Sequence, residues 1–254
     1  MRWLKDTIKS GLQRVGYDIT PYHTKPAFYL RPVGEMRFLL EDLRARGFRP
    51  QSILDVGGNI GEWSKLARAV FPEGELFIVE PQAEMKPYLD GVCAQFPRTK
   101  WLNAGAGPRA GEMTLTIDDV DSGGSSMLPA ASTELKSKGR QRTVPIVTLD
   151  SLVESGQMKV PDLAKFDIQG FELEALRGAQ LLLGKTEVFI LETSLYRFMP
   201  SQPLMHEVIA FMLERGYVIY DLPGFGRRPS DGALGQVDVC FVKSDSQLRA
   251  SNAW

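Results

Sequence analysis

Asp55 and three glycines form the first group of residues whose types and spacing could do chemistry. The run Ile53-Leu-Asp-Val-Gly-Gly-Asn-Ile-Gly61 has the pattern of a buried strand, a glycine turn and a helix start. Glycines permit a tight turn and let a ligand approach the backbone, while a helix N-terminus offers unpaired N–H groups. The turn therefore predicts a cofactor site made from these residues: Asp55, Gly57, Gly58, Asn59 and Gly61.

The positions of the glycines and acids separate the candidate cofactors. Dinucleotide-binding turns need Gly-x-Gly-x-x-Gly, which this turn does not contain. An acid inside the turn would repel a pyrophosphate, whereas Asp55 suits the amino and sulfonium groups of S-adenosylmethionine. Glu80 ends the next strand pattern, 25 positions after Asp55, where a carboxylate can accept both ribose hydroxyl hydrogens. Together the two acids favour S-adenosylmethionine as the cofactor.

Short β-branched runs alternate with helical patterns from residue 52 onward. We expect strands near residues 52–56, 76–80, 99–103, 163–167 and 187–192. The helices between them are predicted at Glu62–Phe71, Ala83–Gly91, Phe171–Gly178 and Pro203–Arg215. This alternation predicts an α/β fold with a mostly parallel, doubly wound sheet.

Two further pairs of strand patterns interrupt that alternation. Tyr217–Leu222 and Gln236–Val242 have no room for a crossover helix between them, so we expect an antiparallel hairpin. A mostly parallel sheet with this ending is typical of Rossmann-like class I methyltransferases. Glu112–Ile117 and Gln141–Thr148 predict a second hairpin, inserted at about residues 108–148, whose loop is either an acceptor wall or a surface excursion.

Asp167 and Glu192 end two predicted strands, at the sheet edge where open α/β sheets bind their ligands. Methyl transfer to an alcohol is an in-line displacement, and a general base for the hydroxyl proton contributes about 10²–10⁴-fold. We predict that Asp167 lies beside both the methionine part of the cofactor and the acceptor. Glu192 and His206 would face the acceptor from the other side. Two carboxylates could also ligate Mg²⁺, although a divalent cation is not expected.

Several motifs together resemble the FkbM family of methyltransferases over roughly residues 50–243. They are Leu54-Asp-Val-Gly-Gly-Asn-Ile-Gly61, Val79-Glu-Pro81, Asn103-Ala-Gly-Ala-Gly107, Lys165-Phe-Asp-Ile-Gln-Gly-Phe-Glu172 with its continuation to Ala179, Leu191-Glu-Thr-Ser194 and Gln202-Pro-Leu-Met-His-Glu-Val208. The resemblance implies O-methylation of a hydroxyl on a sugar, glycan or secondary metabolite, with S-adenosylhomocysteine as second product. It adds Pro81, Asn103, Ala104 and Asp167 to the cofactor site. Many relatives carry Glu where this chain has Gln169.

Composition and charge limit the partners and the compartment. The net charge of -1 gives no broad basic field for nucleic acid, and two cysteines far apart in sequence fit a reducing cytoplasm. No apolar run reaches the roughly 18 residues of a membrane span, although residues 2–16 could make weak peripheral membrane contact. We expect an N-terminal helical extension over residues 1–48 and the methyltransferase domain over residues 49–254. The sequence leaves open a homo-oligomer, and two alternative functions: an oxidoreductase or a non-catalytic scaffold.

Overall fold

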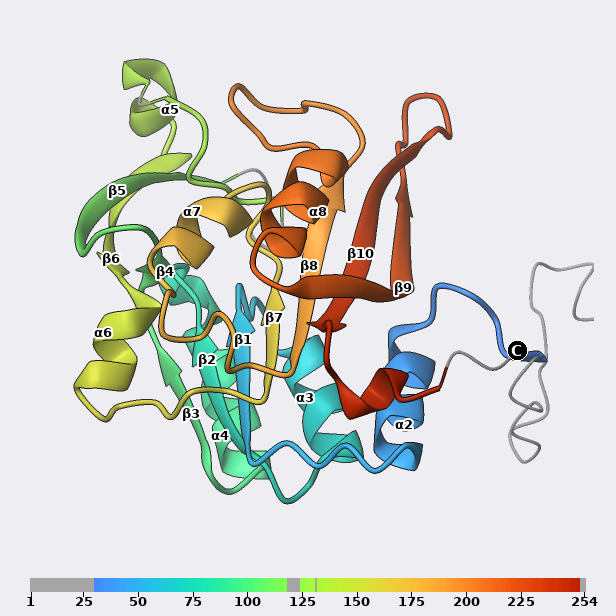
Figure 1. Ribbon diagram of the computed structural model, residues 1–254. Coiled ribbons are helices and arrows are strands. Elements are labelled where there is room, and N and C mark those ends of the chain that lie inside the picture. Colours follow the sequence, from blue (N-terminus) through green and yellow to red (C-terminus); the bar gives the residue numbers. More distant parts are fainter. Residues whose placement is uncertain (1–29, 118–123, 131, 252–254) are drawn as a thin grey trace, which may run out of the picture. The chain divides into compact units, whose positions relative to one another are not determined.

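The structure, a computed structural model, describes residues 30–117, 124–130 and 132–251 (Figure 1). The chain divides between Pro32 and Val33, so helix α2 (Met36–Ala45) belongs to the unit that contains the sheet. The sequence had grouped α2 with the extension at residues 1–48. Residues 2–16, for which weak membrane contact was predicted, lie outside the described residues.

A seven-stranded sheet forms the centre of the unit, with strand order β3-β2-β1-β7-β8-β10-β9. Its first five strands in that order are parallel, and β10 runs antiparallel to both β8 and β9. The strands are β1 (Ser52–Val56), β2 (Glu75–Val79), β3 (Thr99–Leu102), β7 (Leu163–Phe166), β8 (Val188–Ser194), β9 (Tyr217–Arg227) and β10 (Leu234–Lys243). This is the Rossmann-like class I methyltransferase fold, as predicted, including its antiparallel hairpin.

Helices cover both faces of the sheet (Figure 1). Alternate residues of β1 point to opposite faces: Leu54 and Val56 contribute to one apolar core, and Ile53 contributes to the other. The Leu54 core is covered by α6 (Leu149–Glu154), α7 (Glu172–Arg177) and α8 (Met205–Leu213). The Ile53 core is covered by α2, α3 (Glu62–Val70) and α4 (Lys86–Gln95), the last preceded by a 3-10 turn at Ala83–Met85.

A second sheet confirms the inserted hairpin. It has the order β4-β6-β5, with β5 (Gly111–Thr116) antiparallel to β6 (Gln141–Val147) and β4 (Gly105–Ala106) parallel to β6. A short helix, α5 (Thr133–Ser137), precedes β6. Thr116 pairs with Ser126, so the described part of the loop between the two strands returns to the sheet edge.

Strand β9 and helix α6 are two of the elements in which the structure differs from the prediction. Strand β9 continues to Arg227, five residues beyond its predicted end at Leu222, although the added segment contains Pro223 and two glycines. An edge strand tolerates these residues because one side of its backbone makes no ladder hydrogen bonds. Helix α6 was not predicted; the Thr148 hydroxyl caps it by accepting from the backbone N–H of Ser151 at 3.1 Å.

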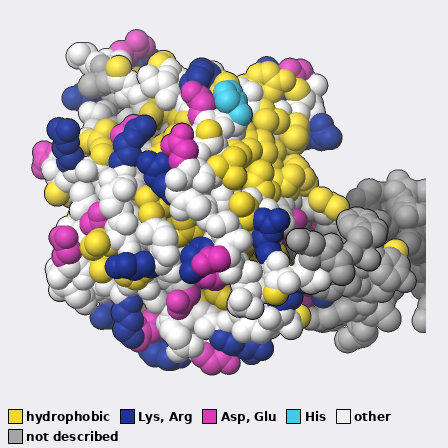
Figure 2. Space-filling view, viewed as in Figure 1, with side chains coloured by type: hydrophobic (Ala, Val, Ile, Leu, Met, Phe, Trp, Pro, Cys, Tyr) yellow, Lys and Arg dark blue, Asp and Glu magenta, His cyan; other side chains and the backbone are white. Residues whose placement is uncertain are grey.

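Hydrophobic side chains gather on one face of the unit, over α8 and the β9–β10 hairpin (Figure 2). Exposed large apolar residues in these elements are Leu213, Ile219 and Phe225. Strand β9 is the edge strand of the sheet, so its outer side could pair with another chain. Such a contact would also bury these exposed apolar side chains. No helix among the described residues has both the length and the apolar character that crossing a membrane requires.

Candidate active site

A cavity of about 600 Å³ lies at the carboxyl ends of β1, β2, β7 and β8, and we call it the strand-end cavity. Its wall includes Gly57 and Asn59 after β1, Glu80 and Pro81 after β2, and Asp167 after β7. Glu192, near the end of β8, lies on the same wall. The structure therefore brings together Asp167, Glu192 and half of the residues predicted to bind the cofactor.

The glycine turn owes its shape to contacts that exclude a side chain. Gly57 has a φ of +86°, and a Cβ atom there would lie 2.0 Å from the carbonyl oxygen of Asp167. Its N–H donates to the Val79 carbonyl at 2.8 Å, which ties the turn to β2. Only glycine combines this backbone conformation with such a close approach. Glycine at position 57 thus lets the turn pack against the backbone that follows β7.

Glu80 is the most constrained acid of the strand-end cavity. It is 2% exposed; one carboxylate oxygen accepts from the Asn59 N–H at 2.9 Å and the other from the Gln82 N–H at 2.8 Å. Burial raises the pKa of Glu80 to about 7, although the two backbone hydrogen bonds oppose that shift. Each oxygen keeps a second lone pair, so the carboxylate can still accept two hydroxyl hydrogens.

The remaining predicted cofactor residues do not line the strand-end cavity. Gly58 and Gly61 face inward, where a Cβ atom would lie 2.2 Å from Ile78 and 2.6 Å from Val92, so these glycines serve close packing. Asn103 supports the site from behind, because its side-chain amide donates to the Glu80 carbonyl at 3.0 Å. Ala104 is buried beside it.

Asp55 also lies away from the strand-end cavity, contrary to its predicted contact with the amino and sulfonium groups. It is 1% exposed, and one oxygen accepts from the Ser64 hydroxyl of α3 at 2.6 Å. On β1 it shares the face of Ile53, whereas Val56 lines the cavity. Burial raises its pKa, opposed by Lys165 and the Ser64 hydrogen bond. Asp55 thus links β1 to α3 through one oxygen, and its other oxygen is buried without a hydrogen-bond partner among the described residues.

Lys165 is a buried cation at the end of β7. Its ammonium group donates to Asp167 at 2.7 Å, and the register places it beside Asp55 on β1. Burial by itself would lower the pKa of Lys165, but the carboxylates of Asp167, Asp55 and Asp238 together raise it. Lys165 therefore stays charged. Its positive charge stabilises the ionised forms of Asp55 and Asp238.

The acids around Lys165 differ in their tendency to ionise. Asp167 accepts hydrogen bonds from Lys165 and, at 3.1 Å, from the side-chain amide of Gln169. Burial raises the pKa of Glu192 well above its usual range, and the neighbouring carboxylates of Asp167, Glu172 and Asp238 raise it further. Burial likewise raises the pKa of Asp238 to about 6. Glu192 and Asp238 thus take up a proton more readily than exposed carboxyl groups do.

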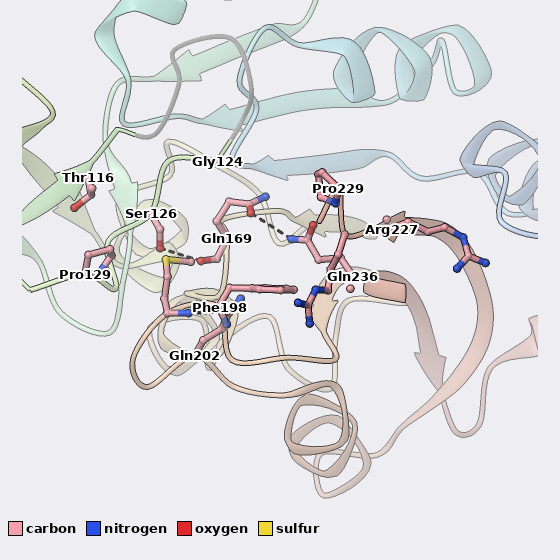
Figure 3. Close-up of a pocket in the computed structure, with 14 residues that line it drawn as sticks. Thr116, Gly124, Ser126, Pro129, Gln169, Phe198, Gln202, Arg227, Pro229 and Gln236 are labelled. Atoms are coloured by element: carbon pink, nitrogen blue, oxygen red, sulfur yellow. Dashed lines mark hydrogen bonds between the residues drawn. The ribbon is translucent and has the colours of Figure 1, made fainter. Parts of the chain in front are cut away.

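A second cavity of about 440 Å³ adjoins the first, and we call it the hairpin cavity because the β9–β10 turn forms one wall (Figure 3). Gln169 and Gln236 line both cavities. The Gln236 amide donates to the Gln169 side-chain oxygen at 3.3 Å, and Gln169 in turn donates to Asp167. A Glu at position 169 could not make that donation. The departure of this chain from the common family motif therefore has a structural consequence.

His206 does not join this group. It is the second residue of α8, its side chain is exposed, and it lines neither cavity. The prediction that it faces the acceptor is not supported by this placement. Among the described residues no group of three or more His, Cys, Asp or Glu side chains is arranged to hold a metal ion. The Lys165 ammonium already occupies one side of Asp167, where a cation would bind.

Three site residues were not assigned roles from the sequence. Lys165 and Gln169 lie within the motif Lys-x-Asp-x-Gln, and alternation along the strand could have placed Lys165 beside Asp55. No sequence pattern predicted a role for Gln82, whose side-chain oxygen accepts from the Ser125 hydroxyl at 3.1 Å. This hydrogen bond joins residues 43 positions apart, which local patterns do not show.

Replacing Lys165 with Met should destabilise the fold, because it leaves buried carboxylates without their cation. We expect a loss of about 3–5 kcal/mol in the free energy of unfolding at pH 8, measured by urea denaturation. The loss should shrink as the pH falls through about 6, where Asp238 takes up a proton. Lys159→Met, which removes an exposed ion pair with Glu75, is the control and should cost less than about 1 kcal/mol. Equal losses in the two variants would contradict the assignment.

Comparisons with known proteins identify the family. Residues 55–219 match the sequence profile described as the methyltransferase FkbM domain. The hexuronic acid methyltransferase AglP of Haloferax volcanii is 27% identical over 158 residues, which cover 62% of this chain and 60% of that protein. The chain thus aligns with less than two thirds of the length of this relative.

Solved structures with a similar arrangement are distant in sequence. A precorrin-6y C5,15-methyltransferase from Geobacter metallireducens is 11% identical, with a TM-score of 0.47, covering 87% of this chain and 93% of that one. A 1,6-didemethyltoxoflavin-N1-methyltransferase from Burkholderia thailandensis, crystallised with S-adenosylhomocysteine, is 12% identical, with a TM-score of 0.45 and coverage of 96% and 90%. By its sequence, the chain belongs to the FkbM family of S-adenosylmethionine-dependent methyltransferases.

Proposed function

We propose that the protein transfers the methyl group of S-adenosylmethionine to a hydroxyl group of a sugar or glycan. The observation that carries this proposal is the position of Asp167. Its carboxylate accepts hydrogen bonds from Lys165 and Gln169, and Gln169 also borders the hairpin cavity. A base at the junction of a cofactor cavity and a second cavity is what methylation of a hydroxyl requires.

The strand-end cavity fits S-adenosylmethionine in two respects. Gly57 lines the cavity, and Glu80 offers two free lone pairs to the ribose hydroxyls. The side-chain oxygen of Asn59 is buried without a hydrogen-bond partner among the described residues, so a donor on the cofactor could satisfy it. When bound, S-adenosylmethionine supplies an electrophilic methyl group on a sulfonium ion.

The chain's own residues supply orientation and proton transfer. An acceptor reaching from the hairpin cavity into the strand-end cavity could place a hydroxyl against Asp167, which would accept its proton while methyl transfer leaves S-adenosylhomocysteine. Gln236 and Gln169 fix the Asp167 carboxylate in position through two consecutive hydrogen bonds. Glu192, whose pKa is raised by burial and by neighbouring carboxylates, can in its protonated form donate a hydrogen bond to the acceptor.

The acceptor class rests on similarity and on the surroundings of Asp167. The relative from Haloferax volcanii is named for hexuronic acid, which is a sugar bearing several hydroxyls and a carboxyl group. Family membership favours methyl transfer over the oxidoreductase alternative. The glycine turn also lacks the spacing that dinucleotide binding needs. A scaffold without activity would not need to keep the glycine turn or Asp167 at the end of β7.

The affinity for S-adenosylhomocysteine should depend on the ionisation of Glu80. The ionised form is the better acceptor of ribose hydroxyls, and with a pKa of about 7 its population rises about tenfold between pH 6 and pH 8. The Kd from isothermal titration calorimetry should therefore fall about tenfold over that interval. Glu80→Gln should bind weakly at both pH values and lose the dependence. Glu84→Gln is the control, since an ion pair with Arg142 lowers the pKa of Glu84, and it should keep the slope.

Catalysis should depend on Asp167 more than on Glu192. We expect Asp167→Asn to lower kcat by about 10²–10⁴-fold, because the amide cannot take the proton. Glu192→Gln should lower kcat by less than about tenfold, because the Gln amide can donate the hydrogen bond that a protonated Glu192 would donate. Both variants should bind S-adenosylhomocysteine as the wild type does.

The assay follows radiolabelled methyl transfer from S-adenosylmethionine to a panel of neutral and uronate-containing saccharides. Label that survives mild alkali is a methyl ether, whereas label released by alkali is a methyl ester. Near-normal turnover in Asp167→Asn would refute the base assignment, and alkali-labile label would refute hydroxyl methylation.

A further inference from the structure

Two arginines are among the residues that line the hairpin cavity. They are Arg227 and Arg228, both near the end of the β9–β10 hairpin. Asp167 and Glu192 line the neighbouring strand-end cavity. An acceptor that spans the two cavities would therefore have arginine at one end and carboxyl groups at the other.

Of the two arginines, Arg228 is the one built into the cavity wall. Its guanidinium stacks on the Tyr196 ring at 4.4 Å, and one nitrogen pairs with Asp231 at 3.3 Å. The backbone of Arg228 is fixed as well, because its N–H donates to the Ala233 carbonyl at 2.8 Å and its carbonyl accepts from the Gly232 N–H at 2.9 Å. A guanidinium has five N–H donors, so most of them stay available for a ligand.

Arg227 is differently placed. Its guanidinium donates to the Gly232 carbonyl at 2.8 Å, and Figure 3 shows the side chain extending away from the other labelled residues of the cavity. It is therefore a close control for Arg228: a neighbouring arginine on the same hairpin, with the same charge and a different direction.

An apolar surface lies next to the Arg228 side chain. A Cβ atom on Gly235 would lie 3.2 Å from the ring of Phe198 and 3.0 Å from Cγ of Arg228. Glycine at this position thus lets the Phe198 ring and the Arg228 stem both pack closely against the backbone of β10. Phe198 is 47% exposed and lines the same cavity. A pyranose ring has an apolar C–H face that can pack on an aromatic ring while its polar substituents bind elsewhere.

We propose that the hairpin cavity binds an acidic sugar, with Phe198 against the ring and the Arg228 guanidinium holding the sugar carboxylate. Bidentate pairing with a carboxylate suits a planar guanidinium. The carboxylate would be kept away from Asp167, so a hydroxyl rather than the carboxyl group is presented to the base. The inference rests on the proposed hydroxyl methylation and adds the chemical class of the acceptor.

The test compares p-nitrophenyl β-D-glucuronide with p-nitrophenyl β-D-glucoside, which differ at the carboxylate. Wild type should show a higher kcat/KM for the glucuronide. Arg228→Gln should lower that value by about 10- to 100-fold, mainly through KM, because a charge-assisted pair is lost. The value for the glucoside should change by less than about threefold. Arg227→Gln should lower the glucuronide value by less than Arg228→Gln does, because the Arg227 guanidinium is bound to the Gly232 carbonyl.

A binding experiment separates this proposal from the proposed reaction. Glucuronide binding to the complex with S-adenosylhomocysteine, measured by calorimetry, should be weakened in Arg228→Gln while the affinity for S-adenosylhomocysteine is unchanged. Glucuronide that binds through Arg228 without methyl transfer would refute the reaction and leave the acidic-sugar site standing. No glucuronide binding to wild type, or an equal loss for glucoside and glucuronide in Arg228→Gln, would overturn the proposal.

Discussion

The Lys165 ammonium group lies among the carboxylates of Asp55, Asp167 and Asp238, and the chemistry of the strand ends depends on this one buried cation. A buried charge is costly unless it is paired, and so is each buried carboxylate. Burial raises the pKa values of Glu192 and Asp238, and Lys165 opposes that shift in both. The same ammonium group donates a hydrogen bond to Asp167, the carboxylate that we propose as the base.

The topology of the sheet makes this arrangement available. Parallel strands β1, β2, β7 and β8 end at one edge, so Glu80, Asp167 and Glu192 reach a common cavity from different parts of the chain. The antiparallel hairpin extends past that edge and closes the second cavity with Arg228. Gln169 and Gln236 connect the two cavities through their side-chain amides. Cofactor chemistry and acceptor recognition are in this way carried by different strands of one rigid sheet.

Much of this arrangement could be predicted from local patterns. Alternation of strand and helix patterns predicted the order of elements, and the acids that end strands, such as Glu80 and Asp167, line the strand-end cavity. Asp55 does not line this cavity, which alternation along β1 could have indicated, because it shares a face with Ile53, which is covered by α3. His206 was assigned to the site without evidence for which side of α8 faces the sheet.

The acceptor side was harder to predict because it depends on long-range contacts. Pro223 and its neighbouring glycines read as a loop, although the edge position of β9 lets the strand continue to Arg227. That extension is what carries Arg228 to the hairpin cavity. Its stacking on Tyr196 and its proximity to Phe198 join segments about 30 residues apart, which no local pattern encodes.

The measurement that tests the central claim most directly is a crystal structure of the protein with S-adenosylhomocysteine. The account predicts the nucleoside in the strand-end cavity, with both ribose hydroxyls within hydrogen-bond distance of the Glu80 carboxylate. The sulfur should face Asp167 and the opening to the hairpin cavity. A nucleoside bound elsewhere, or one whose sulfur points away from Asp167, would contradict the assignment of this carboxylate as the base.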